Sequence, residues 1–98
     1  MQFSVKSSNY QNKSMLNMCD AELLGKKIIE GDLTMHISEN YYGERFVEKD
    51  EAESLLNNSS IINMAGKETI SLALQLGIGS ENAVKLVSDV PFLIIFNM

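Results

Sequence analysis

The chain has 98 residues, of which 45% are hydrophobic and 21% are charged, with 8 Lys and Arg against 13 Asp and Glu. This length suits one domain with one hydrophobic core. The formal net charge of -5 gives no general basic surface for a polyanion or an anionic membrane. The longest apolar run, 90–96, contains Pro91 and is far shorter than the roughly 20 residues that span a bilayer. We therefore expect no membrane association, and any nucleic-acid site would have to be a local basic patch.

The start of the chain and its cysteine content bear on the compartment. The first ten residues lack the apolar run of a secretion signal, so we expect a cytoplasmic protein. Cys19 is the single cysteine, which rules out an internal disulfide and a multi-thiolate zinc site. We expect packing alone to stabilise the fold, with no cofactor.

Alternation of apolar and polar side chains predicts strands in the first half of the chain. The clearest case is 33–38, where every second side chain is apolar. The polar stretch 7–13 is typical of a hairpin loop, and Asp20 is expected to be the N-cap of a short helix that Gly25 ends. The tyrosine-rich segment 40–44 is expected to be a turn. Expected strands in this half cover residues 2–6, 14–19, 33–38 and 45–48.

The second half is expected to alternate strands with helices. The spacing of Asp50 and Glu53 resembles a capping box at the start of one helix. Apolar side chains from Ile70 to Leu76 line another helix, which Gly77 ends. Expected strands cover residues 60–65, 83–87 and 92–96, the last apolar on both faces and so central or covered. The sequence thus predicts a single compact α+β domain over 1–98, with a mixed β-sheet and two to three helices.

Cys19, Asp20 and the lone His36 form the only set that could support nucleophilic catalysis, because a thiol needs a base or a positive field to become a thiolate. A small buried cysteine beside a capping aspartate explains the same residues without chemistry. As a metal ligand, His36 would need carboxylates such as Glu39 or Glu44. We predict no catalytic residue and no metal site, and keep a small enzyme built on Cys19 and His36 as an alternative.

Two short segments suggest binding. Tyr41 and Tyr42 lie on the expected turn, and aromatic rings on a loop commonly anchor a partner or stack against bases; core-capping tyrosines are the competing interpretation. Gly66 precedes an expected helix whose first amides, with Lys67, could receive an anion, although ordinary helix initiation explains the glycine as well. The candidate binding residues are Asp20, Lys26, Lys27, Tyr41, Tyr42, Arg45, Asn63 and Lys67.

The segment 18–26, Met-Cys-Asp-Ala-Glu-Leu-Leu-Gly-Lys, resembles the Cys-Asp-x-x-Leu-Leu-Gly motif of the archaeal family known as domain of unknown function 424. Later motifs agree in order. Segment 41–43 is similar to the family's Phe-Tyr-Gly turn, 63–67 to its Asn-x-x-Gly element before a helix, and 90–91 to its Val-Pro, so the resemblance spans residues 2–96.

The chain departs from this pattern at two positions. Glu44 stands where many members have a second glycine, and Phe92 where many have a histidine after the Val-Pro. Because phenylalanine cannot replace a histidine in chemistry or metal binding, the second departure weakens the enzyme interpretation further.

The resemblance implies an archaeal cytoplasmic protein with an association to RNA and translation. Together with the aromatic turn and its neighbouring cations, it favours a non-enzymatic binding module whose partner is RNA or a ribonucleoprotein. The acidic total charge opposes this hypothesis. A protein–protein interaction domain, with another protein as the partner, is the alternative beside the small enzyme.

Overall fold

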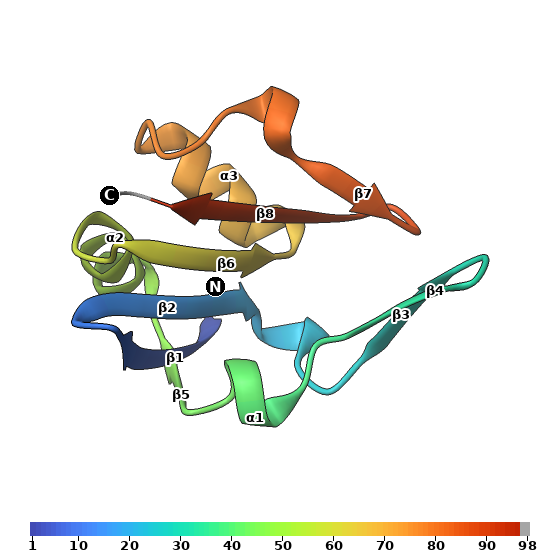
Figure 1. The fold of residues 1–98 in the computed structure, drawn as a ribbon, viewed down its shortest axis with the longest axis horizontal. Coiled ribbons are helices and arrows are strands. Elements are labelled where there is room, and N and C mark those ends of the chain that lie inside the picture. Colours follow the sequence, from blue (N-terminus) through green and yellow to red (C-terminus); the bar gives the residue numbers. More distant parts are fainter. Residues whose placement is uncertain (97–98) are drawn as a thin grey trace.

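The computed structural model describes residues 1–96 as a six-stranded mixed sheet, two helices packed on one of its faces, and a separate two-stranded hairpin (Figure 1). The strand order in the sheet is β5-β1-β2-β6-β8-β7. Its strands are β1 (Phe3–Tyr10), β2 (Lys13–Asp20), β5 (Arg45–Val47), β6 (Ile61–Ala65), β7 (Lys85–Val87) and β8 (Val90–Phe96). The hairpin pairs β3 (Lys27–Glu30) with β4 (Leu33–His36), and the helices are α1 (Glu39–Tyr42), α2 (Lys49–Asn57) and α3 (Lys67–Gln75). The predicted α+β class, with a mixed sheet and two to three helices, is confirmed.

One parallel pair lies at the centre of this sheet. β2 and β6 run in the same direction, with Asn17 opposite Asn63 and Cys19 opposite Ala65, while the other strand pairs are antiparallel. The carboxyl ends of two parallel strands meet at one edge of the sheet, which is where α/β proteins commonly bind ligands. α3 begins at this edge, separated from the end of β6 by one residue, Gly66.

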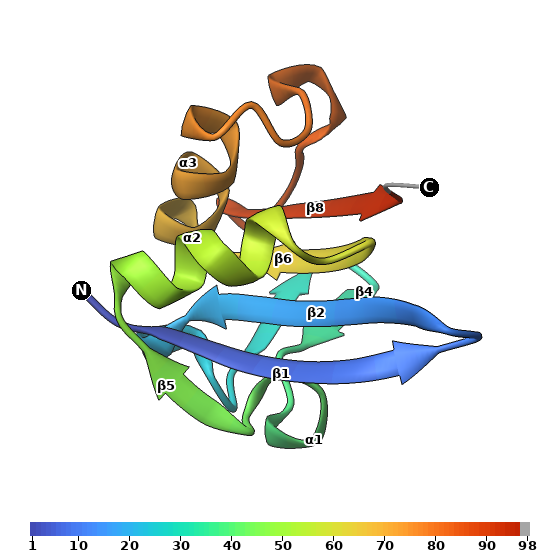
Figure 2. The same ribbon diagram turned by 90° about the vertical axis from the view of Figure 1, so that its left-hand side faces the viewer.

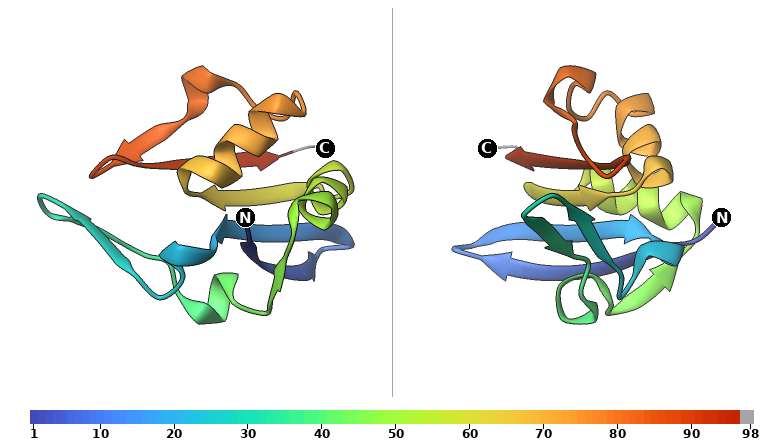
Figure 3. Two further views of the ribbon diagram at one scale, coloured as in Figure 1. Left: turned by 180° about the vertical axis from the view of Figure 1, so that it is seen from behind. Right: turned by 90° about the vertical axis from the view of Figure 1, so that its right-hand side faces the viewer.

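The main core lies between the sheet and the two longer helices. α2 and α3 pack on the same face of the sheet (Figures 2 and 3). Side chains that alternate along the strands point to this face and are buried, as the period of two requires. The strands contribute Phe3, Val5, Leu16, Met18, Ile62, Met64 and Leu93, and the helices contribute Ala52, Leu56, Ile70, Leu72 and Ala73. None of the helices within residues 1–96 is long and apolar enough to cross a bilayer.

The first hairpin corrects the prediction of a loop over 7–13. β1 and β2 stay paired up to Tyr10 opposite Lys13, and only Gln11 and Asn12 form the turn. Both turn residues have positive φ angles, 50° and 67°, as in the two-residue turns whose twist matches that of the strands. The prediction was wrong because this end of the β1–β2 hairpin extends into solvent. The side chains of residues 7–10 are all exposed, so the strand shows no alternation of apolar and polar residues there.

Four further elements differ from expectation. Residues 27–30, where no strand is expected, form strand β3, which pairs with β4. The tyrosine turn is a single helical turn, α1, because Ser38 accepts a hydrogen bond from the amide of Tyr41 and caps it. α2 begins at Lys49, so Glu48 and not Asp50 is its N-cap residue. The strand expected over 83–87 is reduced to Lys85–Val87 by a 3-10 turn over Glu81–Ala83.

β8 confirms only part of what its composition predicts. It lies between β6 and β7, and Leu93 is buried under the helices. Ile94 and Phe96, which alternate with the buried side, are exposed. The second face of this strand is therefore uncovered at Ile94 and Phe96, whereas Phe92 on the same face is partly buried.

Candidate functional site

Asp20 lies at the carboxyl end of β2 and caps a helix other than the one expected. Its Oδ2 accepts a hydrogen bond from the amide of Glu68 at 3.1 Å. Its Oδ1 accepts two, from the amide and from the hydroxyl of Thr69, both at 2.8 Å. The following 3-10 turn, Ala21–Leu23, receives no side-chain hydrogen bond from Asp20. Asp20 thus supplies the N-terminal cap of α3 from a neighbouring strand.

Gly66 makes room for this contact. It occupies the N-cap position of α3 with a φ of 109°, and a Cβ atom built there would lie 2.4 Å from Cγ of Asp20. Its amide donates a hydrogen bond to the carbonyl of Pro91 at 2.9 Å. The segments around Asp20, Gly66 and Pro91, which carry three of the motifs, therefore meet at one point. We call these contacts the lock, and their role in stabilising the fold is sufficient to explain why the three segments lie together.

A pocket of about 440 Å³ opens beside this lock, and we call it the strand-end pocket. Its charged lining residues are Asp20, Glu22, Lys26, Lys67, Glu68 and Asp89. At the start of α3 the amides of Glu68 and Thr69 already donate to the carboxylate of Asp20, and the amide of Gly66 donates to the carbonyl of Pro91. The charge of Asp20 also repels a second anion at this point. The structure therefore gives no support to the interpretation of Gly66 and Lys67 as an anion site.

The thiol of Cys19 is enclosed in a small second core. It is fully buried in a cluster with Ile37 and Ala65, against which Tyr42 and Phe92 pack. Burial, and then the negative charge of Asp20, raise the pKa of Cys19 to about 12. Burial, followed by the nearby Cys19, raises the pKa of Tyr42 to about 12. A thiol that keeps its proton at neutral pH is a poor nucleophile, so the geometry does not support the small-enzyme alternative.

The buried thiol predicts a loss of stability at alkaline pH. A cysteine in the unfolded chain releases its proton near its ordinary pKa of about 8.5, whereas the folded chain holds the proton up to about 12. The stability gained from Cys19 is therefore complete below pH 8.5 and is lost as the pH rises through this window. By pH 10 the loss should be on the order of 2 kcal/mol.

Urea unfolding of the wild type and of Cys19→Ala at pH 7 and at pH 10 measures this loss. The variant should decline less between the two pH values, because it lacks the titrating thiol and retains the other ionisable groups. The ordinary pKa of tyrosine, about 10, leaves most of the Tyr42 effect to higher pH. An equal decline in both proteins would contradict the burial of Cys19 as a protonated thiol.

His36 is exposed on the hairpin, opposite Lys27 in the register of β3 and β4. Within residues 1–96 no group of three or more His, Cys, Asp and Glu side chains is placed to hold a metal ion. Glu39 and Glu44, the carboxylates considered for a site with His36, are exposed side chains on α1 and beside β5. The structure thus offers no geometry on which to build a metal site at His36.

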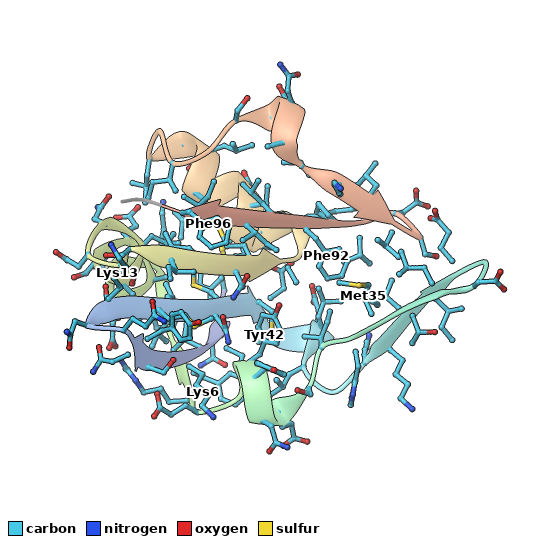
Figure 4. All side chains as sticks on the ribbon, viewed as in Figure 1. Lys6, Lys13, Met35, Tyr42, Phe92 and Phe96 are labelled. Carbon is cyan, nitrogen blue, oxygen red and sulfur yellow. The ribbon has the colours of Figure 1, made fainter. Side chains whose placement is uncertain are left out.

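The face of the sheet opposite α2 and α3 is the second candidate site. α1 and the start of the hairpin cover only one end of it, over Ser4 and Cys19 (Figure 1). Strand residues that alternate with those of the main core point to the uncovered part of this face, which we call the open face. It comprises Lys6, Tyr10, Lys13, Met15, Asn17, Ile61, Asn63, Ile94 and Phe96. Figure 4 shows Lys6, Lys13 and Phe96 around this surface.

Two asparagines lie in the middle of the open face. Nδ2 of Asn63 donates to Oδ1 of Asn17 at 2.7 Å, across the parallel pair of strands. Nδ2 of Asn17 donates in turn to the carbonyl of Tyr41 at 2.9 Å, which fixes α1 at the border of the face. Asn17 is buried, whereas Asn63 is partly accessible. The amide of Asn63 therefore keeps hydrogen-bonding groups available at the surface.

Charge and aromatic rings set this face apart from the rest of an acidic protein. The charged residues at positions of the six-stranded sheet that point this way are all lysines: Lys6, Lys13 and, beside Phe92, Lys85. Phe96 and Tyr10 are 68% and 56% exposed. The side chain of Tyr41 is exposed at the border that α1 forms. The open face thus combines positive charge, accessible rings and amide groups.

The predicted binding residues are divided among several surfaces. Tyr41 and Asn63 belong to the open face or its border, while Tyr42 packs over Cys19 and its carbonyl accepts a hydrogen bond from Ser4 at 2.6 Å. Lys27 is exposed on β3. Arg45 pairs with Glu51 of α2, on the helix side of the sheet. The remaining candidates, Asp20, Lys26 and Lys67, line the strand-end pocket.

An alternation with a period of two marks the open-face positions Lys6, Tyr10, Lys13 and Phe96, but the loop expected over 7–13 obscured it at Tyr10 and Lys13. In a continuous strand over 3–10, every second residue from Ser4 to Tyr10 shares one face, and Lys13 joins it through the two-residue turn. The same alternation places Phe96 with Ile94. Continuing the period of two through the polar residues would have brought these side chains together.

The elements described so far define an α+β protein with a six-stranded mixed sheet, one face covered by helices and the other partly open. The chain belongs to the family described as protein of unknown function (DUF424), whose model matches residues 8–98. This confirms the resemblance seen in the motifs.

A crystal structure of an uncharacterized conserved protein from Methanopyrus kandleri has a similar fold, with a TM-score of 0.84 and 21% sequence identity. The match covers 100% of this chain and 93% of that protein. No curated protein matches the chain.

Proposed function

We propose that this protein is a non-enzymatic module that binds single-stranded RNA on the open face. The observation that carries the proposal is that, within residues 1–96, the charged residues at strand positions pointing to this face are all lysines, although acidic residues outnumber basic ones in the chain. A local positive field of this kind attracts phosphates despite a negative total charge.

The other groups on the open face suit unpaired bases. Exposed rings at Tyr10, Tyr41 and Phe96 offer flat surfaces for stacking, and β-sheets that present aromatic side chains bind single strands in this way. The accessible amide of Asn63 can hydrogen-bond the edge of a base. A duplex hides these base edges and faces, so the surface favours a single strand.

Two alternatives have different support. The exposed side chains Ile94 and Phe96 also suit a protein partner, so a protein–protein interaction domain is the second candidate function. Catalysis by Cys19 and His36 has no geometric support, because the thiol is buried and protonated. The proposed partner is thus RNA or a ribonucleoprotein, in the cytoplasm.

Titration with a ten-nucleotide oligouridylate at several salt concentrations tests the RNA proposal. Binding should weaken with salt, and the logarithmic slope should fall by about 0.7 in Lys13→Ala, because one phosphate contact is lost. Lys49→Ala is the matched control, since Lys49 is an exposed lysine that begins α2 on the helix side. It should change the slope little.

Phe96→Ala tests the stacking part of the same proposal. Loss of one base–aromatic contact should weaken binding by about tenfold or more. Leu86→Ala provides the control, because Leu86 is exposed on the edge strand β7 and lies opposite Pro91, on the other parity from Phe96. Absence of salt-sensitive binding by the wild type would refute the RNA proposal and leave the protein-binding alternative.

A further inference from the structure

An apolar groove adjoins the open face. It has a volume of about 340 Å³ and lies between hairpin β3–β4 and strands β7 and β8. Leu33 and Met35 line it from the hairpin, and Val87, Phe92 and Ile94 line it from the sheet. Figure 4 shows Met35 and Phe92 toward the hairpin end of the molecule, beyond Tyr42.

The groove continues the open face along β8. Ile94 belongs to both surfaces, and Phe92 is the next residue of the same parity toward the hairpin. Lys85 lies opposite Phe92 in the register of β7 and β8 and also lines the groove. An RNA strand bound along Phe96 and Ile94 would therefore reach the apolar groove, with Lys85 beside it.

A hydrogen bond ties the two walls of this groove together. The amide of Ser88, in the turn between β7 and β8, donates to Oε1 of Glu30 in the hairpin at 2.6 Å. This bond engages the carboxylate of Glu30 and holds the hairpin near β7. The width of the groove is thus set before any ligand binds, which lowers the cost of ordering on binding.

We propose that the groove receives one unstacked nucleobase of the RNA strand bound on the open face. This inference rests on the proposed function, because the strand must lie on that face to reach the groove. The volume falls in the range of small-ligand pockets, roughly 300 to 1,000 Å³. The ring of Phe92 and the thioether of Met35 provide soft apolar contacts for the faces of a base, and Lys85 provides a charge for its phosphate.

Two substitutions on the same hairpin test the groove. Leu33 is 48% exposed and lines the groove, whereas Ile29 is 59% exposed and lies on the other face of the hairpin. Leu33→Ser should weaken binding of the ten-nucleotide oligouridylate by about tenfold, while Ile29→Ser should bind like the wild type. Both positions tolerate a polar residue, since neither side chain is part of a buried core.

Photocrosslinking supplies a readout independent of affinity. An oligouridylate that carries 4-thiouridine should crosslink to the segments 33–35 and 85–94 in the wild type, and Leu33→Ser should reduce this yield relative to crosslinks at Phe96. Equal affinity of Leu33→Ser and Ile29→Ser, with crosslinks confined to the open face, would overturn the groove proposal and leave RNA binding intact. A wild type that binds no oligouridylate would overturn both.

Discussion

Gly66→Ala should be among the most destabilising single substitutions in this chain, with a loss of about 3 to 5 kcal/mol in the free energy of unfolding. Two causes add. The φ of 109° at Gly66 is one that side chains with a Cβ rarely adopt. In addition, the new methyl group would lie 2.4 Å from Cγ of Asp20 and push the carboxylate away from the amides of α3. Urea unfolding followed by circular dichroism measures the change.

A double-mutant cycle separates the two causes. In an Asp20→Ala background the methyl group of Gly66→Ala no longer meets a carboxylate, so only the backbone cost of about 1 to 3 kcal/mol should remain. Gly77→Ala is a useful reference, because Gly77 also has a positive φ but no neighbouring atom within 4 Å of a built Cβ. If Gly66→Ala cost no more than Gly77→Ala, the close contact with Asp20 would be disproved.

The helix side of the fold could be predicted well because its patterns are local. The apolar side chains from Ile70 to Leu76 and the glycine after them identified α3, and the brief apolar segment within 60–65 identified the strand before it. These signals depend on periodicity and on end residues within a few positions. The same holds for β4, where every second side chain is apolar.

The other side of the fold depends on contacts between distant residues. Asp20 has the residue type of a helix cap, and local sequence assigned it to the next turn, whereas the actual helix begins 47 residues later at Lys67. The open face needs the pairing of β2 with β6, which brings Asn17 to Asn63. Neither pairing leaves a periodic trace in a single sequence, so sequence reasoning could not show that the candidate residues are divided among several surfaces.

Under the proposed function, the contacts around Asp20 and the open face have different roles at opposite ends of β2. At its carboxyl end, the buried carboxylate of Asp20 joins β2, α3 and, through Gly66, the carbonyl of Pro91. Toward its other end, Lys13 and Met15 lie on the open face beside Ile61. Substitutions at the lock should therefore act on folding, and those on the open face on binding. Measuring both properties for each variant distinguishes the two.

Asp20→Ala is expected to lower the free energy of unfolding by roughly 2 to 4 kcal/mol, because it leaves two amides of α3 and the Thr69 hydroxyl without their acceptor. Asp20→Asn should lower the free energy of unfolding less than Asp20→Ala, since its side-chain oxygen can still accept a hydrogen bond. It should still be destabilising, because its NH₂ group would face an amide of α3 that is also a donor. Thr69→Val removes only the hydroxyl partner and isolates that contribution. Urea unfolding at pH 7 measures all three. A cost for Asp20→Ala as small as that of an exposed acidic residue, such as Asp50→Ala in α2, would show that this carboxylate does not stabilise the start of α3.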